Sequence, residues 1–403
     1  MNLVNSKMEN KKLVLAYSGG LDTSYCLMKL TQEGYEVHAI SVNTGGFDTA
    51  EVEDMKTKAL QMGAHTYKSV NALDSFYSKV VKYLIFGNVL KNNTYPLSVS
   101  AERIVQAMEI VAYANEIGAD AIAHGSTGAG NDQVRFDLIF QVMAPNIKII
   151  TPIRDQQLSR EAEIEYLKEN GVSLSWEKVQ YSVNQGLWGT SIGGKETLTS
   201  HDSLPESAYP SPMEKQDAEK VILHFEKGEL IAIDSVTNNP VNNIIKLQQQ
   251  AKKFGIGRDT HVGDTIIGIK GRVGFEAAAP LLIIKAHHLL EKHTLSKWQQ
   301  FQKEQLGNFY GMLLHEGQYL DPVMRDLEAF LSNSQSTVSG KVFVTLHPYR
   351  FELNGIESEY DLMNAAFGSY GEVNKGWSAN DAKGFIKLLS NQNKIYQYVN
   401  KEK

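Results

Sequence analysis

The segment LAYSGGLDTSYC, residues 15–26, connects the end of an apolar run to the start of a predicted helix. Ser18, Gly19 and Gly20 follow the run directly, and Asp22 comes two residues later. A strand-to-helix turn of this composition leaves backbone N–H groups free to bind phosphate, and its glycines let phosphate oxygens approach. The turn lacks the lysine that the Walker phosphate loop places on the β- and γ-phosphates. Hydroxyl and amide groups are therefore expected to hold the phosphates; the alternative is a plain turn capped by Asp22.

The composition of the 403-residue chain is that of a folded, enzyme-like protein. The length exceeds the roughly 250 to 300 residues that one hydrophobic core usually supports, so we expect more than one domain. Hydrophobic residues make up 42%, yet no apolar stretch approaches the ~20 residues that a membrane-spanning helix needs. The net charge of −6 argues against a nucleic-acid partner, and the single cysteine, Cys26, fits a reducing cytoplasm. We therefore expect a cytoplasmic protein without a membrane passage.

The N-terminal part of the chain alternates short apolar or β-branched runs with helical stretches. Strands buried on both faces are predicted at residues 11–18, 36–43, 64–70, 120–126 and 146–153. Helices are predicted over residues 48–63 and 100–118, the second with Ser100 as its N-cap and Gly118 at its end. This alternation predicts an α/β fold with a parallel sheet. Ligands of such sheets bind at the carboxyl ends of the strands, where the glycine-rich turn falls.

From about residue 173 the pattern changes to α+β. Residues 220–234 are predicted to form a hairpin, residues 243–257 a helix that ends at Gly255, and residues 280–306 one long helix. Residues 378–403 are predicted to form an amphipathic helix whose apolar side is covered by a neighbouring subunit or by the chain itself. We expect three units: a nucleotide-binding domain at 1–172, an α+β substrate domain at 173–370 and a C-terminal oligomerisation helix at 371–403.

A second segment, AHGSTGAGNDQVRFDLIF at residues 123–140, is dense in small and polar side chains. Three glycines and a charged pair directly after a strand favour a binding loop over an ordinary surface loop. The residue types suit a zwitterion, because Thr127 and Asn131 can donate hydrogen bonds to a carboxylate while Asp132 pairs with an ammonium group. Arg135 can pair with a further carboxylate.

The pattern Ser-Gly-Gly-x-Asp-Thr/Ser after a strand resembles the pyrophosphate (PP) loop of the ATP pyrophosphatases, which break ATP between its α- and β-phosphates. Over nearly its whole length the sequence resembles the argininosuccinate synthase family, through AYSGGLDTS, YPLSVSAERI, HGSTGAGNDQVRF, WGTSIGG and GIGR. The resemblance implies a parallel-sheet PP-loop domain of the adenine nucleotide alpha hydrolase-like type, followed by an α+β synthetase domain and a C-terminal helix. It also implies a homotetramer.

The resemblance further implies an ATP-dependent C–N ligase of arginine biosynthesis. In this family the ureido oxygen of citrulline attacks the α-phosphate of ATP, which gives citrullyl-AMP and pyrophosphate. The amine of L-aspartate then displaces AMP to form argininosuccinate. We expect Mg2+ to accompany ATP, with Asp22 as its candidate ligand, and no permanently bound metal. No side-chain nucleophile is expected, since positioning and charge stabilisation can supply the rate.

Carried over position by position, the resemblance implies three groups of binding residues. The ATP-binding residues are Ala16, Tyr17, Ser18, Gly19, Gly20, Leu21, Asp22, Thr23, Ser24, Val42 and Gly125. The aspartate-binding residues are Thr127, Asn131 and Asp132. The citrulline-binding residues are Tyr95, Ser100, Asn131, Arg135, Ser182 and Ser191.

Two further citrulline-binding positions depart from the family pattern. Aligned without gaps between residues 255 and 276, the family's Glu falls on Gly263 and its Tyr on Phe275. A Glu in an amino-acid site most plausibly faces the α-ammonium group, because an unpaired buried charge costs several kcal/mol. One hypothesis is that the substrate is an N-acylated citrulline, whose neutral amide needs no Glu. The alternative is that Asp264 or Glu276 supplies the carboxylate.

Other classes of protein fit the sequence less well. A tRNA thiolase would need paired cysteines, a tRNA-modifying lysidine synthase a basic RNA-binding region, and NAD or asparagine synthetases a source of ammonia. A non-catalytic nucleotide-binding regulatory module would have no use for an aspartate site. His287, His288 and His293 lie in a helical run without acidic or Cys companions at ligand spacing, so we expect structural or surface roles. Cys26 is expected to pack in the core.

Overall fold

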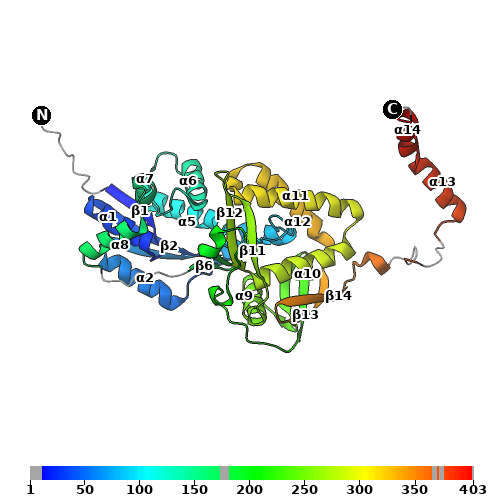
Figure 1. Cartoon of the computed structure of the whole chain (residues 1–403), viewed down its shortest axis with the longest axis horizontal. Helices are drawn as coiled ribbons and strands as arrows, with labels where there is room; N and C mark the ends of the chain where they lie inside the picture. Colours follow the sequence, from blue (N-terminus) through cyan, green and yellow to red (C-terminus); the bar gives the residue numbers. More distant parts are fainter. Residues whose placement is uncertain (1–10, 173–180, 365–369, 372–375, 402–403) are drawn as a thin grey trace.

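The computed structural model describes residues 11–172, 181–364, 370–371 and 376–401 (Figure 1). Its N-terminal part is built on a five-stranded parallel sheet with strand order β3-β2-β1-β4-β5. The strands are β1 (Lys11–Ala16), β2 (Tyr35–Asn43), β3 (Thr66–Asn71), β4 (Ala121–Ala123) and β5 (Lys148–Ile150). The five predicted strands and their parallel arrangement are therefore confirmed.

Helices cover both faces of this sheet because successive residues of its central strand point to opposite sides. Leu13 of β1 belongs to one buried cluster, with residues of α1 (Leu21–Gln32), α2 (Thr49–Gln61) and α8 (Arg160–Glu169). Val14 belongs to another, with residues of α5 (Glu102–Ile117) and α6 (Asp132–Met143). Cys26 lies in the first cluster, and burial raises the pKa of its thiol, so its predicted packing role is confirmed.

The ends of the predicted helices are partly as expected. Asp48 caps α2, where its carboxylate accepts the backbone N–H of Glu51 at 2.8 Å. Helix α5 ends at Gly118, which adopts a left-handed conformation at φ +64°. The predicted N-cap at Ser100 is wrong, because its hydroxyl instead donates to the carbonyl of Leu97 at 3.3 Å and the helix begins at Glu102.

The C-terminal part contains two further sheets. The larger has strand order β10-β9-β8-β13-β14 and pairs only antiparallel neighbours. Its strands are β8 (Glu219–Glu226), β9 (Glu229–Ile233), β10 (Val236–Thr237), β13 (Gly340–His347) and β14 (Arg350–Glu357). The predicted hairpin at residues 220–234 is β8 and β9, with both Lys227 and Gly228 at positive φ in the turn. The predicted helix before Gly255 is α9 (Pro240–Ala251), extended by a 3-10 turn.

The smaller, four-stranded sheet lies next to the parallel sheet near the centre of the molecule (Figure 1). Its order is β11-β12-β7-β6, with β6 (Ser182–Gly186), β7 (Gly189–Gly193), β11 (Arg258–Asp264) and β12 (Lys270–Glu276). The turn between β6 and β7 contacts the loop after β2, where the N–H of Leu187 donates to the carbonyl of Thr44 at 2.8 Å. The indole of Trp188 donates to the carbonyl of Pro96 at 2.9 Å. The four-stranded sheet therefore faces the carboxyl ends of the parallel strands.

The single helix predicted over residues 280–306 is wrong. The structure has two helices, α10 (Ala278–Thr294) and α11 (Lys297–His315), separated by an extended Leu295. Ser296 begins the second helix with a capping box, in which its N–H donates to the side chain of Gln299 at 3.0 Å. This local cap interrupts an apolar pattern that by itself continues through the break. A further helix, α12 (Val323–Ser334), packs against α11.

The C-terminal segment forms two short helices rather than the predicted one: α13 (Ala379–Leu389) and α14 (Asn391–Val399), joined at Ser390. Both lie apart from the rest of the chain (Figure 1), and neither has a buried residue. Their apolar side chains are therefore not covered by the described part of this chain. No helix among the described residues is long and apolar enough to cross a membrane.

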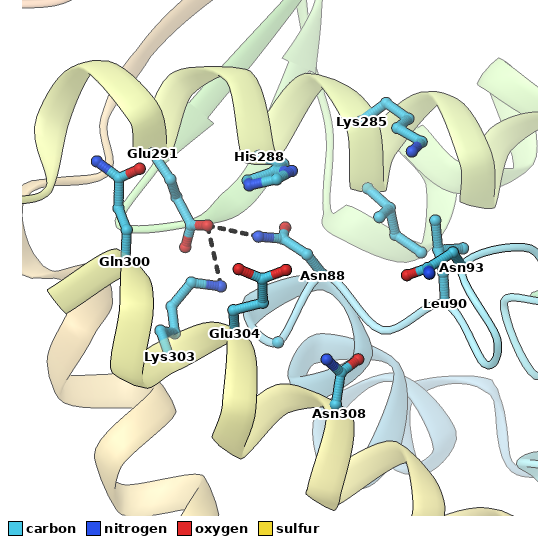
Figure 2. A pocket seen from close by; sticks show the side chains of 12 residues that line it. Asn88, Leu90, Asn93, Lys285, His288, Glu291, Gln300, Lys303, Glu304 and Asn308 are labelled. Atoms are coloured by element: carbon cyan, nitrogen blue, oxygen red, sulfur yellow. Dashed lines mark hydrogen bonds and ion pairs between the residues drawn. The ribbon is translucent and has the colours of Figure 1, made fainter. Parts of the chain in front are cut away.

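A buried polar network joins α10 to α11 beside a cavity of about 110 Å³. Figure 2 shows Glu291, Lys303 and Asn88 pointing toward one another, with the carboxylate of Glu291 2.9 Å from the ammonium group of Lys303. His287 is held by the side chains of Asn88 at 2.7 Å and Gln335 at 2.8 Å. None of the predicted binding residues lines this cavity. In the described ranges no group of three or more His, Cys, Asp or Glu side chains could hold a metal ion.

Substitution of Lys303 by Met tests the network. We expect Lys303→Met to lower the free energy of unfolding by about 3 kcal/mol, because it leaves the charge of Glu291 buried and unpaired. The double variant Glu291→Gln/Lys303→Met should lose less than the single variant, and Lys292→Met, at an exposed site on α10, should change stability by less than about 0.5 kcal/mol. Urea unfolding measures all three. A loss in Lys303→Met no larger than in Lys292→Met would contradict this interpretation.

Candidate active site

The glycine-rich turn forms the junction between β1 and α1. Gly19 adopts φ +73°, and a Cβ atom there would lie 2.9 Å from Cγ of Met55 in α2. The hydroxyl groups of Ser18 and Thr23 lie 3.3 Å apart, and Thr23 donates to the carbonyl of Gly20 at 3.3 Å. The first amides of a helix have no acceptor within it, so the N-terminal end of α1 offers N–H groups to a ligand.

The remaining predicted ATP-binding residues support this turn from the core. Tyr17 is buried, its N–H donates to the carbonyl of Ile40 at 2.9 Å, and its carbonyl accepts the hydroxyl of Ser41 at 2.6 Å. Burial raises the pKa of Tyr17 to about 12, so its hydroxyl is neutral. Ala16 ends β1, Leu21 and Ser24 are buried in α1, and Val42 lies near the carboxyl end of β2.

The loop after β4 lies directly on the N-terminal end of α1. A Cβ atom on Gly125 would be 3.2 Å from both the backbone carbonyl carbon and Cβ of Asp22. The loop is fixed by His124, whose Nε2 lies 2.8 Å from Asp137, and the same carboxylate accepts Arg154 at 2.7 Å. Sequence reasoning missed His124, Asp137 and Arg154, because the two pairings join residues 13 and 17 positions apart.

A buried carboxyl group accompanies Asp22. Glu163 of α8 is 3% exposed. Burial raises the pKa of Glu163 to about 8, and the neighbouring Asp22 adds to the rise. Glu163 is therefore largely protonated at neutral pH. No sequence pattern marks this contact, since Glu163 is one of two acidic residues in the first turn of α8.

Asp132 lies between two arginines at the start of α6. One carboxylate oxygen accepts Nε of Arg103 at 2.9 Å and the other accepts Nη1 of Arg135 at 2.9 Å. Burial opposes ionisation, but the charges of the two arginines outweigh it and hold the pKa of Asp132 at about 2. Arg135 is 3% exposed and also donates to the carbonyl of His315 at 3.0 and 2.9 Å. This cluster joins α5, α6 and α11.

Glu102 extends the cluster toward the four-stranded sheet. Its carboxylate accepts Nη1 of Arg103 at 2.8 Å and the hydroxyl of Thr44 at 2.9 Å. Burial raises the pKa of Glu102 to about 7 despite these two partners. Gly186 at the end of β6 lies so close to this carboxylate that a Cβ atom there would overlap it. Neither Glu102 nor Arg103 was among the predicted site residues.

The predicted aspartate-binding residues occupy one loop and the start of the helix that follows it. Thr127 is exposed, and Asn131 and Asp132 are half-buried. The side-chain oxygen of Asn131 accepts the N–H of Ile266 at 2.9 Å. Because Ile266 lies in the turn between β11 and β12, Asn131 connects the parallel-sheet part to the four-stranded sheet.

Most predicted citrulline-binding residues converge around Tyr95. Its buried ring centroid lies 5.4 Å from that of Phe275, and Phe275 is the cross-strand neighbour of Ser191. The buried Ser100 follows on the same segment as Tyr95, and Arg135 lies close enough to act on the Tyr95 pKa. Ser182 is exposed at the start of β6, two positions along the ladder from Ser191.

At Gly263, where the resemblance places a Glu, the position of a Cβ atom is crowded by a histidine two residues earlier on the same strand. A Cβ atom on Gly263 would lie 2.6 Å from Nε2 of His261, whose ring stacks on Tyr95 at 5.1 Å between centroids. The two carboxylates considered as substitutes are paired elsewhere. Glu276 is buried and accepts Nε of Arg258 at 3.0 Å, and Asp264 is exposed and pairs with Lys270 at 2.7 Å. His261 was missed from the sequence because nothing local marks its contact with Tyr95.

Two family models cover these elements. The model described as "Arginosuccinate synthase N-terminal HUP domain" matches residues 12–173, and the model described as "Arginosuccinate synthase C-terminal domain" matches residues 181–396. The chain belongs to the argininosuccinate synthase family. The HUP domain comprises the parallel sheet and both loops of the site, which implies the use of ATP, and the C-terminal domain comprises the two antiparallel sheets and the C-terminal helices.

Curated relatives named argininosuccinate synthase are similar over nearly their full length. The protein from Methanocaldococcus jannaschii is 36% identical over 394 residues, which cover 97% of this chain and 99% of the relative. The Dictyoglomus turgidum protein is 36% identical over 391 residues, covering 96% and 98%. The Halalkalibacterium halodurans protein is 36% identical over 400 residues, covering 98% and 97%.

Substitution of Gly125 by Ala tests the contact between the two loops. The added methyl group would press on the backbone of Asp22, and overpacking of this kind costs about 1–3 kcal/mol, so we expect ATP binding to weaken about tenfold. Gly128→Ala is the control, because its Cβ atom would make an ordinary contact 3.6 Å from Arg154. Titration calorimetry with ATP measures both variants. Equal affinities would contradict the proposed position of the nucleotide.

Proposed function

We propose that the chain is an argininosuccinate synthase that joins a citrulline-type substrate to L-aspartate while ATP becomes AMP and pyrophosphate. The observation that carries the proposal is the contact of Gly125 with Asp22. Through this contact the PP loop and residues 127–132 share one edge of the parallel sheet, with Tyr95 and Phe275 of the citrulline set nearby. Membership of the argininosuccinate synthase family supports the same assignment.

The PP loop holds the triphosphate through the amides of α1 and the hydroxyls of Ser18 and Thr23. Asp22 fits a magnesium ion bound together with ATP, because Mg2+ is usually held by one or two carboxylates plus substrate phosphates. Bound there, the ion screens the charge of the phosphates. Glu163 lies beside Asp22 and is largely protonated at neutral pH, so it adds no second full charge at this position.

The reaction takes place in two displacement steps. The ureido oxygen of the substrate attacks the α-phosphorus of ATP, the bond to the bridging oxygen breaks, and pyrophosphate leaves with that electron pair. The amine of aspartate then attacks the activated ureido carbon, loses a proton, and AMP leaves with the original ureido oxygen. A lysine on the β- and γ-phosphates is not needed, because both phosphates depart together. The protein contributes positioning and charge stabilisation.

Asp132 and its neighbours orient the attacking aspartate. A carboxylate has about four lone-pair sites, and the two arginines occupy one on each oxygen of Asp132. The remaining sites can accept N–H bonds from the substrate ammonium group before it loses protons. Thr127 and Asn131 are the donors for the substrate carboxylates.

The proposal is tested by product analysis with each substrate omitted in turn. AMP and pyrophosphate should form in equal amounts, and in quantity only when ATP, aspartate and a citrulline-type substrate are all present. We expect Asp22→Asn to lower kcat/KM about 100-fold or more, since a charged group of the phosphate site is lost. Asp54→Asn, at an exposed position of α2, is the control. ADP as product, or AMP formed without aspartate, would contradict the proposal.

We also propose that α13 and α14 dock on another copy of the chain, in a homotetramer. Their apolar side chains are widely exposed, including Phe385 at 65%, Leu388 at 71% and Ile395 at 63%. A contiguous apolar face of this kind on a helix pair normally marks an interaction surface.

Charged substitutions on this face test the assembly. Leu388→Asp/Ile395→Asp should convert the tetramer to smaller species, because burial of an unpaired carboxylate opposes docking. Asn391→Asp, exposed at the start of α14, adds charge without removing an apolar side chain and should leave the assembly intact. Analytical ultracentrifugation distinguishes the species. A wild-type chain that sediments as a monomer would refute the proposal.

A further inference from the structure

We infer that the citrulline side of the site accepts an N-acylated citrulline, whose α-nitrogen is an uncharged amide. The inference rests on the proposed function and names the substrate class of the same site. It is carried by the arrangement of His261, Gly263 and Tyr95, and by the charges that surround them.

The side chains of His261 and Asn92 crowd the place that a side chain at Gly263 would take. A Cβ atom would lie 2.6 Å from Nε2 of His261 and 3.3 Å from Nδ2 of Asn92. His261 is itself fixed, because it is 6% exposed and stacks on the ring of Tyr95. The space from which a Glu at this position would start toward the substrate is therefore filled by an imidazole ring.

This imidazole cannot replace the missing negative charge. Burial and the nearby Lys91 lower the pKa of His261 to about 4, so the ring is neutral at physiological pH. Its Nδ1 is buried and has no hydrogen-bond partner among the residues that the structure describes. A neutral ring offers no counter-charge to an ammonium group, whereas an amide needs none.

Three carboxylates near Tyr95 already have cationic partners, and the free lone pairs of Asp132 are assigned to the ammonium group of aspartate. Asp132 is held between Arg103 and Arg135 at 2.9 Å from each. Asp264 pairs with Lys270 at an exposed position, and Glu276 is buried against Arg258. An α-ammonium group placed beside Tyr95 would face none of these carboxylates in an unpaired state, and an unpaired charge in a closed site costs several kcal/mol.

Lys91, near Tyr95 and His261, is a cation without an ion pair among the described residues. The N–H of Lys91 donates to the carbonyl of Tyr95 at 2.7 Å, and its side chain acts on the pKa values of His261 and His315. The charges of Asp264 and Glu316 favour the protonated form of Lys91. In the described part of the chain, however, no carboxylate oxygen lies within 4.0 Å of its ammonium nitrogen. Lys91 repels an ammonium group and attracts a carboxylate, so it favours a substrate with an acylated nitrogen and a net negative charge.

The inference sets the order of two chemical steps around this enzyme. The ligation leaves the α-nitrogen untouched, so its product keeps the acyl group. An amidohydrolase that removes the acyl group must then act after this enzyme rather than before it.

A comparison of substrates tests the inference by two separate readouts. Citrulline, N-acetylcitrulline and N-succinylcitrulline are titrated into the full-length protein with a non-hydrolysable ATP analogue, and AMP release is measured with ATP and aspartate. We expect at least one acylated compound to bind about tenfold or more tightly than citrulline, since a neutral amide avoids an unpaired charge. Tighter acyl binding without AMP release would support the substrate class and refute the proposed function. Equal or tighter binding of free citrulline would overturn the inference.

A pair of variants tests the role of Gly263 directly. His261→Ala/Gly263→Glu makes room for a carboxylate and should shift the preference toward free citrulline about tenfold or more by restoring a counter-charge. His261→Ala/Gly263→Gln has the same shape without the charge and should not shift it. Lys91→Met should weaken the binding of N-succinylcitrulline more than that of N-acetylcitrulline. Thermal unfolding checks that all variants fold, and identical preferences in the Glu and Gln variants would contradict the inference.

Discussion

The ion cluster of Arg103, Asp132 and Arg135 is the interaction on which the site depends. It ties α5 to α6, and through the carbonyl of His315 it ties both to the end of α11, so segments about 200 residues apart in sequence meet at one buried charge group. Removal of one member would leave another charge buried without a partner, which costs more than the intact cluster contributes. Arg103 also donates to Glu102, whose contacts with Thr44 and Gly186 continue the network into the four-stranded sheet. The cluster and Glu102 thus link α5, α6 and α11 to the four-stranded sheet.

Activation and substrate choice are handled by different parts of the chain. The PP loop lies at the end of a central strand, where glycine conformation and free amides decide what it binds, and its chemistry follows from a dozen contiguous residues. We propose that the choice of substrate is made by side chains on separate elements around Tyr95. In this proposal Gly263, where the resemblance places a Glu, alters the electrostatics of the citrulline site without changing the phosphate site, some 240 residues earlier in sequence.

The sequence predicted what is encoded locally and missed what depends on distant partners. The parallel strands, the hairpin at Lys227 and the helix end at Gly118 follow from residue patterns within each element, and the structure has them. The break at Ser296 was also local, but apolar periodicity hid the capping box. The sequence does not reveal the roles of Arg103, Glu163 and His261, because each role depends on a contact with a side chain far away in sequence. These partners are Asp132, Asp22 and Tyr95, respectively. Ser100 was wrongly made a helix cap by composition, and its place in the citrulline set stays a prediction.

The measurement that tests this chemistry most directly follows the ureido oxygen. If that oxygen attacks the α-phosphate, a substrate labelled with oxygen-18 in its ureido group must transfer the label to AMP, one atom per molecule formed. The label should be absent from pyrophosphate, and its appearance in AMP should require aspartate under turnover conditions. Unlabelled AMP from a labelled substrate would mean that water or another group attacks ATP, and the adenylation mechanism described for this site would be wrong.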